Sequence, residues 1–457
     1  MNSPRTALHL LLGQLQKSFE NLKVEISPHA LEGLASTVYQ VLTARERRYH
    51  TTRHVSDSSI LKDPSWTLAA SFYDLVYLQT DKRVHPLIRP ALEGFVVDED
   101  LSVTVPAADS ENMPYYLKLT LRVFEVSPGK KLKLSAEENK FLSAVVAAYF
   151  LCDLIEAWDL FRVLVCIQAT VPILGLAHLE DHAGDRLLQR LELMNVEFQF
   201  KKTHEELKQL VSLAMSVANH DRMAFAASPE VFLTQVLSLM LETHPVLRNP
   251  GCSIRQMRMS FQRYHQYLRS LDSNQIFQRF KGLPLDLEYI RLKKKADQNL
   301  SFALSFFRAI LVALYLLEAV SMLTGGDAPY LLFTGHPSFW EAKSSMHGGS
   351  QIFLSSLMQR VKERGGCPTV SDLFPFVAYL TAEMTDSEIY PVMALEEQYV
   401  KGDLSGLDFL SSAYSPDLLQ ACLQALAQVT MTRQKRILEV REFLATQARK
   451  IHQKSIA

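Results

Sequence analysis

The chain of 457 residues has little cysteine and no excess of charge of either sign. Its five cysteines are an odd number, lie far apart and include no CxxC pair, which argues against a disulfide framework and against a zinc ribbon. The 48 basic and 49 acidic side chains nearly balance, so no global field would attract nucleic acid or an anionic membrane. We therefore expect a cytoplasmic protein with neither nucleic acid nor a membrane as its partner.

Several catalytic signatures are also missing. The sequence contains no P-loop, GxSxG, HExxH, dinucleotide fingerprint or EF-hand loop. The pair Gly325-Gly326 lacks the downstream lysine and Ser/Thr of a P-loop, and the end of a helix explains it better. Two long apolar stretches, 144–176 and 302–323, contain charged residues that would be costly in lipid. We expect both to form buried core helices of a soluble protein.

Helical periodicity dominates the chain, and convincing strand patterns are few, which predicts an all-α fold. Helix starts are expected at Ser27-Pro28, at Asp63-Pro64 and at Ser135, where Glu138 three residues on completes a capping box. The segment 115–126 alternates like a strand, but its flanking residues favour a helix. We predict three regions: a helical domain over 1–200, a second helical unit packed on it over 201–340, and a C-terminal helical region over 341–457.

Two motifs in the first region carry ligand-type side chains. The segment RRYHTTRHV contains His50 and His54, whose i, i+4 spacing would place them on one face of a helix. About twenty residues on, LAASFYDLVYLQ reads as a second, apolar helix that would carry Asp74 into the interior. Imidazoles and carboxylates that converge on a cation form a hydrolytic metal site. Alternatively, Asp74 forms a structural bridge with Arg53 or His54, because a buried acid needs a partner.

The pair of motifs YHTTRHV and AASFYDLVY resembles the HD-domain superfamily of metal-dependent phosphohydrolases. It is most similar to a branch whose members read YHxxxH and then FHDxxY. In this resemblance His54 matches the first metal-ligand histidine, Asp74 matches the aspartate of the His-Asp pair, and Tyr73 stands where its histidine would be. His50 matches an additional histidine of that branch.

The resemblance implies an HD-like helical bundle at the N-terminus with additional helices packed on it towards the C-terminus. It also implies a divalent metal cofactor (Mn, Fe, Mg or Zn) and hydrolysis of a nucleotide or another phosphoester, so that the partner would be a small phosphorylated molecule. His50 would contact phosphate or donate a proton. Tyrosine is a poor ligand for magnesium or zinc because its pKa is about 10. Tyr73 therefore predicts reduced or lost activity.

A further ligand would have to come from a later helix. Asp153 and Glu156 are three residues apart in FLCDLIEAWDL, which reads as part of a continuous apolar helix. Acids in such a setting are candidates for a functional site, and we predict Asp153 as a metal ligand and Glu156 as a catalytic acid or base. Both could equally pair with Arg162 or with a neighbouring helix.

Two other clusters compete with this site. The segment AHLEDHAGD offers four metal-ligand types within eight residues, but it is polar and reads as solvated: His178, Asp181, His182 and Asp185. A literal His220-Asp221 pair ends an apolar helix in VANHDRMAF. That segment loosely resembles one in bacterial proteins with an HD-like N-terminal part. Asn219 and Asp221 are therefore candidate ligand-binding residues, although both are also good helix stops.

Two functions thus remain open from the sequence. The first is an HD-type phosphohydrolase with reduced or lost activity. The second is a non-catalytic, all-helical protein descended from such a hydrolase that binds a ligand or another protein. The first predicts that His54 and Asp74 both lie in a polar cleft, with Asp153, Glu156 or Asp221 within coordination reach. The second predicts that His54 and Asp74 hydrogen-bond each other and leave no room for a cation.

Overall fold

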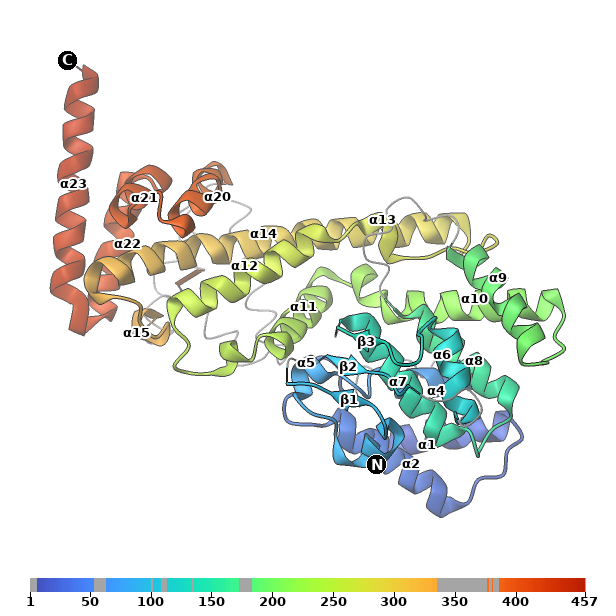
Figure 1. The fold of residues 1–457 in the computed structure, drawn as a ribbon. Helices are drawn as coiled ribbons and strands as arrows, with labels where there is room; N and C mark the ends of the chain where they lie inside the picture. The colour runs from blue at the N-terminus through green and yellow to red at the C-terminus, as the bar shows by residue number, and fades with distance from the viewer. Residues whose placement is uncertain are drawn as a thin grey trace, which may run out of the picture. The chain divides into compact units, whose positions relative to one another are not determined.

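The computed structural model of the chain describes residues 6–52, 63–99, 102–107, 113–133, 135–171, 183–334, 376–377, 380 and 386–456. These residues are predominantly helical, and their strands form one small sheet (Figure 1). The predicted all-α class is therefore confirmed. The chain divides into two compact units, Met1–Ala227 with Asp272–Asp297, and Ser228–Leu271 with Gln298–Ala457. Each unit is thus built from two separate stretches of sequence.

The first unit contains most of the shorter helices and the sheet. Its strands pair antiparallel in the order β1-β2-β3, with Val96 opposite Thr104 and Val103 opposite Leu132. Its elements are α1 (Ala7–Asn21), α2 (Pro28–Leu42), α4 (Pro64–Phe72), α5 (Leu78–Asp81), η1 (Pro86–Leu92), β1 (Val96–Val97), β2 (Val103–Thr104), α6 (Tyr115–Val123), β3 (Lys131–Leu132), α7 (Ala136–Leu151), α8 (Ala157–Ala169), α9 (Ala183–Glu197), α10 (His204–Asp221), η3 (Met223–Ala226), α13 (Ser273–Ile276) and the first part of α14 (Asp286–Gly325).

Helix α8 lies at the centre of this unit, where it packs against α4, α7 and α10 (Figure 1). Its sequence is apolar around most of its circumference, so that it is covered on several sides. The neighbouring α7 is buried in the same way over 144–148. Because α4 and α7 both pack against α8, polar groups at the ends of α4 and α7 lie next to the core.

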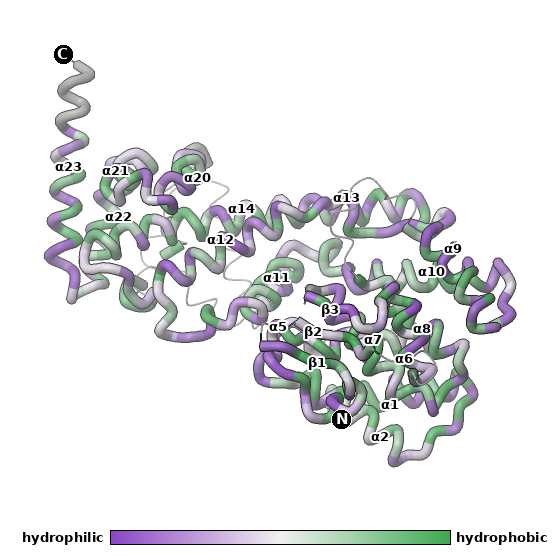
Figure 2. Tube along the Cα trace, viewed as in Figure 1, coloured by the Kyte–Doolittle hydropathy of each residue, from purple (hydrophilic) through white to green (hydrophobic). Residues whose placement is uncertain are grey.

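The second unit is arranged along α12 and the remainder of α14. Figure 2 shows mostly hydrophobic residues along α11 and mostly hydrophilic residues along α12. The elements of this unit are α11 (Pro229–Thr243), η4 (Pro245–Arg248), α12 (Ile254–Ser270), α14 from Gln298, α15 (Leu331–Thr334), α20 (Asp386–Lys401), α21 (Gly406–Ala413), α22 (Pro416–Val429), η5 (Met431–Arg433) and α23 (Gln434–Ile456).

Helix α14 is the one helix in the described part of the chain that is long and apolar enough to cross a membrane. Of its most apolar window, 72% is buried inside the protein. Core helices have this same composition, so the helix by itself is weak grounds for a membrane span.

Local signals predicted several helix starts correctly. Ser27 accepts a hydrogen bond from the Ala30 N–H, and Asp63 caps α4 in the same way. Ser135 and Glu138 form the predicted capping box at the start of α7. The ambiguous segment 115–126 contains the helix α6, as favoured.

Candidate functional site

The Tyr73-Asp74 pair does not lie in the middle of a helix. Helix α4 ends at Phe72, Tyr73 is its C-cap, and Asp74 follows in a turn. The predicted helix over 68–79 is therefore wrong beyond its first residues. Side chains from distant segments bind the backbone here in place of helical hydrogen bonds. The buried Arg47 guanidinium donates to the carbonyl oxygens of Asp74 and Leu75.

One further side chain and an ion pair fix this turn. The Ser143 hydroxyl oxygen accepts a hydrogen bond from the Val76 N–H at 2.9 Å. Arg47 also pairs with Asp81, with 2.7 Å between Nη2 and Oδ2, and its side chain is 0% exposed. The turn is thus held by residues about 30 and 70 positions away in the sequence.

The Asp74 carboxylate is paired with a lysine. Lys140 Nζ lies 2.7 Å from Asp74 Oδ1, and the two side chains are only 11% and 4% exposed. Lys140 comes from the second turn of α7, where it points into the core beside the end of α4. A charge-assisted hydrogen bond of this kind satisfies two charges that would be costly to bury alone.

Tyr73 belongs to the same cluster. The Lys140 ammonium lies 3.9 Å from the centroid of the Tyr73 ring, a cation–π contact. The Tyr73 hydroxyl donates a hydrogen bond to the Asp221 carboxylate at the end of α10. Burial, followed by the nearby charges of Asp221 and Asp74, raises the pKa of the Tyr73 phenol well above its usual value. Tyr73 is therefore a neutral hydrogen-bond donor.

The structure thus brings together three of the predicted residues, Tyr73, Asp74 and Asp221. The missed partner is Lys140, whose signal in the sequence is a single cation on a helix that is otherwise apolar beyond its first turn. Asn219 has a different role, because its side chain exchanges two hydrogen bonds with the backbone of Gln278, at 2.7 and 2.8 Å. It anchors the segment after α13 to the end of α10.

His50 lies near this cluster but in a different environment. It is buried in a bend after α2 and not in a helix. The predicted placement of His50 on one face of a helix is therefore wrong. Its ring lies 4.3 Å from the Tyr77 ring and 4.8 Å from the Tyr49 ring, measured between centroids. His54 lies outside the described residues.

Asp153 and Glu156 are not brought to Asp74. Both are exposed, in a turn that separates α7 from α8, so the predicted continuous helix is interrupted here. Lys140 and this turn lie at opposite ends of α7, roughly 16 Å apart along the helix axis. Asp153 instead contacts Cys152, whose thiol pKa is raised by burial and then by this acid.

Of the competing cluster in AHLEDHAGD, only Asp185 is described, and it pairs with Lys281 at 3.0 Å. His178, Asp181 and His182 lie outside the described residues. Within the described residues, no group of three or more His, Cys, Asp or Glu side chains is arranged to hold a metal ion.

The described side chains around Asp74 do not fit a divalent metal. A neutral phenol stands where the resemblance would place an imidazole, and a lysine ammonium already contacts Oδ1 of the Asp74 carboxylate. A second cation at Asp74 Oδ1 would have to displace Lys140 against like-charge repulsion. The described side chains instead form a buried network of one lysine, two carboxylates and one phenol.

Comparison with known proteins adds no name to this cluster. No protein-family model, no curated protein and no solved structure matches the chain. The similarity to HD-type phosphohydrolases therefore depends on the two motifs in the sequence, and the function has to be argued from the cluster itself.

Proposed function

We propose that the chain is a non-catalytic descendant of the HD-type phosphohydrolases, in which the metal centre has become a structural ion pair and the protein acts by binding. The observation that carries this proposal is the buried contact of 2.7 Å between Lys140 and Asp74. Hydrolysis of a phosphoester in this family requires an ionised acid that is free to hold a metal. Here that acid is held by Lys140 from α7.

The state of Tyr73 supports the same proposal. A phenol with a strongly raised pKa remains protonated at neutral pH, so it donates a hydrogen bond and does not ligate a cation. Its acceptor is Asp221, a second acid of the cluster. Both carboxylates are thus engaged with protein groups. In a working phosphohydrolase a metal ion would have to share or compete for the Asp74 carboxylate with Lys140.

Metal content and hydrolysis test the proposal together. We expect the purified, untagged protein to contain far less than one Mn, Fe or Zn per chain. We also expect no hydrolysis of nucleotides or other phosphoesters above the level of an Asp74→Asn variant, with Mn, Mg, Fe or Zn supplied. Near-stoichiometric metal that is lost in both His54→Ala and Asp74→Asn, with metal-dependent turnover, would instead establish the hydrolase.

A further inference from the structure

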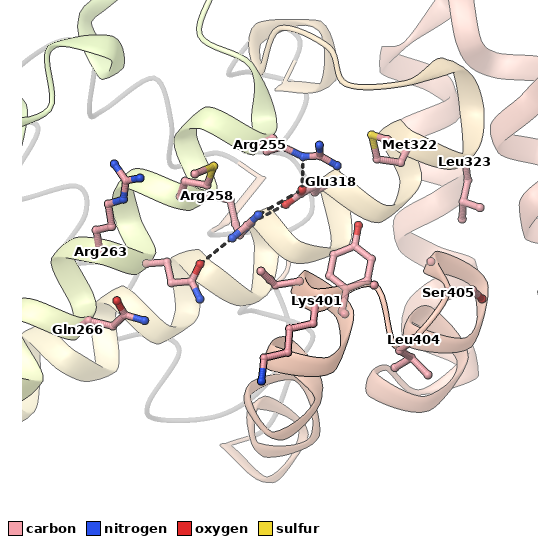
Figure 3. Close-up of a pocket in the computed structure, with 16 residues that line it drawn as sticks. Arg255, Arg258, Arg263, Gln266, Glu318, Met322, Leu323, Lys401, Leu404 and Ser405 are labelled. Carbon is pink, nitrogen blue, oxygen red and sulfur yellow. Dashed lines mark hydrogen bonds and ion pairs between the residues drawn. The ribbon is translucent and has the colours of Figure 1, made fainter.

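The second unit contains a pocket of about 770 Å³ that is separate from the Tyr73-Asp74 cluster. One wall is a face of α12, the second is α14 near Glu318, and the third is the end of α20 with the turn that leads to α21 (Figure 3). This volume is in the range of sites for small organic ligands. The pocket is therefore large enough for a molecule of nucleotide size.

The lining is strongly basic. Among the described residues that line the pocket, four are cationic, Arg255, Arg258, Arg263 and Lys401, and Glu318 is the one acid. Low-dielectric walls strengthen the field of such a surplus of positive charge. The pocket should therefore concentrate anions.

Glu318 holds two of the arginines in place without neutralising both. Its carboxylate is 3% exposed and accepts from Arg255 Nε at 2.9 Å and from Arg258 Nε at 2.6 Å (Figure 3). Arg258 is almost fully buried and also donates to the side-chain oxygen of Gln262 at 2.6 Å. The guanidinium groups are thus pre-positioned, which reduces the entropy lost when a ligand binds.

Arg255 and Arg263 still have unused hydrogen-bond donors. Arg255 is 48% exposed and contacts Glu318 through Nε, so its Nη groups have no hydrogen-bond acceptor within the described part of the chain. Arg263 is exposed and has no acidic partner among the described residues. Guanidinium groups bind phosphate through two parallel hydrogen bonds.

The spacing of the arginines selects among phosphates. Arg255 and Arg263 are eight residues apart on α12, which is about 12 Å along the helix axis. A chain of two or three phosphates matches this length along the face better than a single phosphate does. The other two walls are partly apolar, with Met322 and Leu323 on α14 and the Tyr399 ring on α20, which stacks on Phe409 at 4.4 Å between centroids.

We propose that this pocket binds an organic diphosphate or triphosphate, with the phosphate chain along Arg255, Arg258 and Arg263 and the organic body against Met322 and Tyr399. The proposal does not depend on the proposed function, since Asp74 lies in the other unit.

Calorimetric titration of the full chain with inorganic triphosphate, orthophosphate and adenosine triphosphate at one ionic strength tests this proposal. We expect saturable 1:1 binding of triphosphate, tighter binding of adenosine triphosphate, and little binding of orthophosphate. Arg255→Gln and Arg263→Gln should each weaken triphosphate binding by roughly tenfold or more. Neither change removes the partner of buried Glu318, because Arg258 remains.

Arg269→Gln is the matched control, because Arg269 is exposed on the same helix but does not line the pocket. It should leave the affinity unchanged. The site is refuted if folded protein does not bind triphosphate, or if Arg269→Gln weakens binding as much as Arg263→Gln. Equal affinities for orthophosphate and triphosphate would refute the phosphate chain, and equal affinities for triphosphate and adenosine triphosphate would refute the organic body. Loss of binding in Asp74→Asn alone would place the site in the first unit.

Discussion

At the scale of single residues, the environment of a group decides its chemistry more than its type does. Asp74 has the identity of a metal ligand, yet Lys140 contacts its carboxylate in the core. Tyr73 stands where the resemblance would place a histidine, and burial keeps its phenol neutral. Removing either charge of a buried pair leaves the other uncompensated, which typically costs about 3–5 kcal/mol. Such a pair persists in the fold because each partner needs the other.

His265 provides a second example, in the second unit. Burial, and then the positive charges of Arg308 and Arg269, lower the pKa of this imidazole to about 4. The unfolded chain takes up a proton near pH 6.5, whereas the folded chain does so only near pH 4. The folded state is therefore fully favoured above pH 6.5, and its stability falls as the pH drops from there towards 4, by at most about 3 kcal/mol.

Urea unfolding at several pH values between 7 and 4 measures this loss. We expect His265→Gln to unfold with a shallower pH dependence than the wild type over that window. His29→Gln, which changes an exposed histidine on α2, should leave the slope unchanged. Identical slopes for wild type and His265→Gln would show that this histidine does not resist protonation.

At the scale of elements, the capping residues at helix starts could be predicted from the sequence, whereas the end of α4 could not. The caps at Ser27, Asp63 and Ser135 act within three residues, so their signal is present in a short stretch of sequence. The turn after Tyr73 depends on Arg47 and Ser143, which are distant in the sequence. No local pattern contains that information, and the apolar run continued past the true helix end.

Contact between α9 and the segment after α13 depends on a glycine. A Cβ at Gly184 would clash with the ring of Phe280, which is buried. We expect Gly184→Ala to destabilise the first unit by about 1–3 kcal/mol through overpacking. Gly33→Ala is the matched control, since Gly33 lies within α2 and an added Cβ there meets no atom within 4 Å.

The control should change stability in the opposite direction, by about 0.5–1 kcal/mol in favour of folding, because alanine has the higher helix propensity. Thermal unfolding of both variants measures the difference. Equal effects of the two substitutions would contradict the packing of Phe280 against α9.

At the scale of the whole molecule, the sequence predicted the helical class, but no pattern in it indicates that a later segment returns to the first unit. The segment Asp272–Asp297 returns to the first unit, after Ser228–Leu271 has entered the second. Asn219 and Arg222 hold that segment by hydrogen bonds to backbone oxygens of Gln278 and Ile276. These contacts join residues more than 50 positions apart, so periodicity and composition could not indicate them.

The candidate site was predictable to a similar extent. The motifs identified Tyr73, Asp74 and Asp221 as residues of interest, and the fold brings them together. Lys140 was missed, because a lysine near the start of a helix normally reads as solvated. Asp153 and Glu156 were predicted to lie on one continuous helix that runs through the core. The structure has a turn at this point, which exposes both side chains. The sequence shows which side chains could take part in a site, but which of them pair with one another depends on the tertiary structure.

The coupling between Lys140 and Asp74 tests the central claim most directly. Lys140→Met, Asp74→Asn and the double variant form a double-mutant cycle, measured by urea unfolding with and without EDTA. Tryptophan fluorescence is a suitable signal because Trp66 and Trp158 lie in the first unit. The more exposed pair Lys208 and Glu205, 3.6 Å apart with side chains 33% and 69% exposed, provides the control cycle with Lys208→Met and Glu205→Gln.

We predict a coupling free energy of about 2 kcal/mol or more for the buried pair, unchanged by EDTA, and less than about 1 kcal/mol for the control pair. Additive effects of Lys140→Met and Asp74→Asn, together with a wild type that loses stability in EDTA, would contradict the account. That result would mean that a metal ion, and not Lys140, holds Asp74.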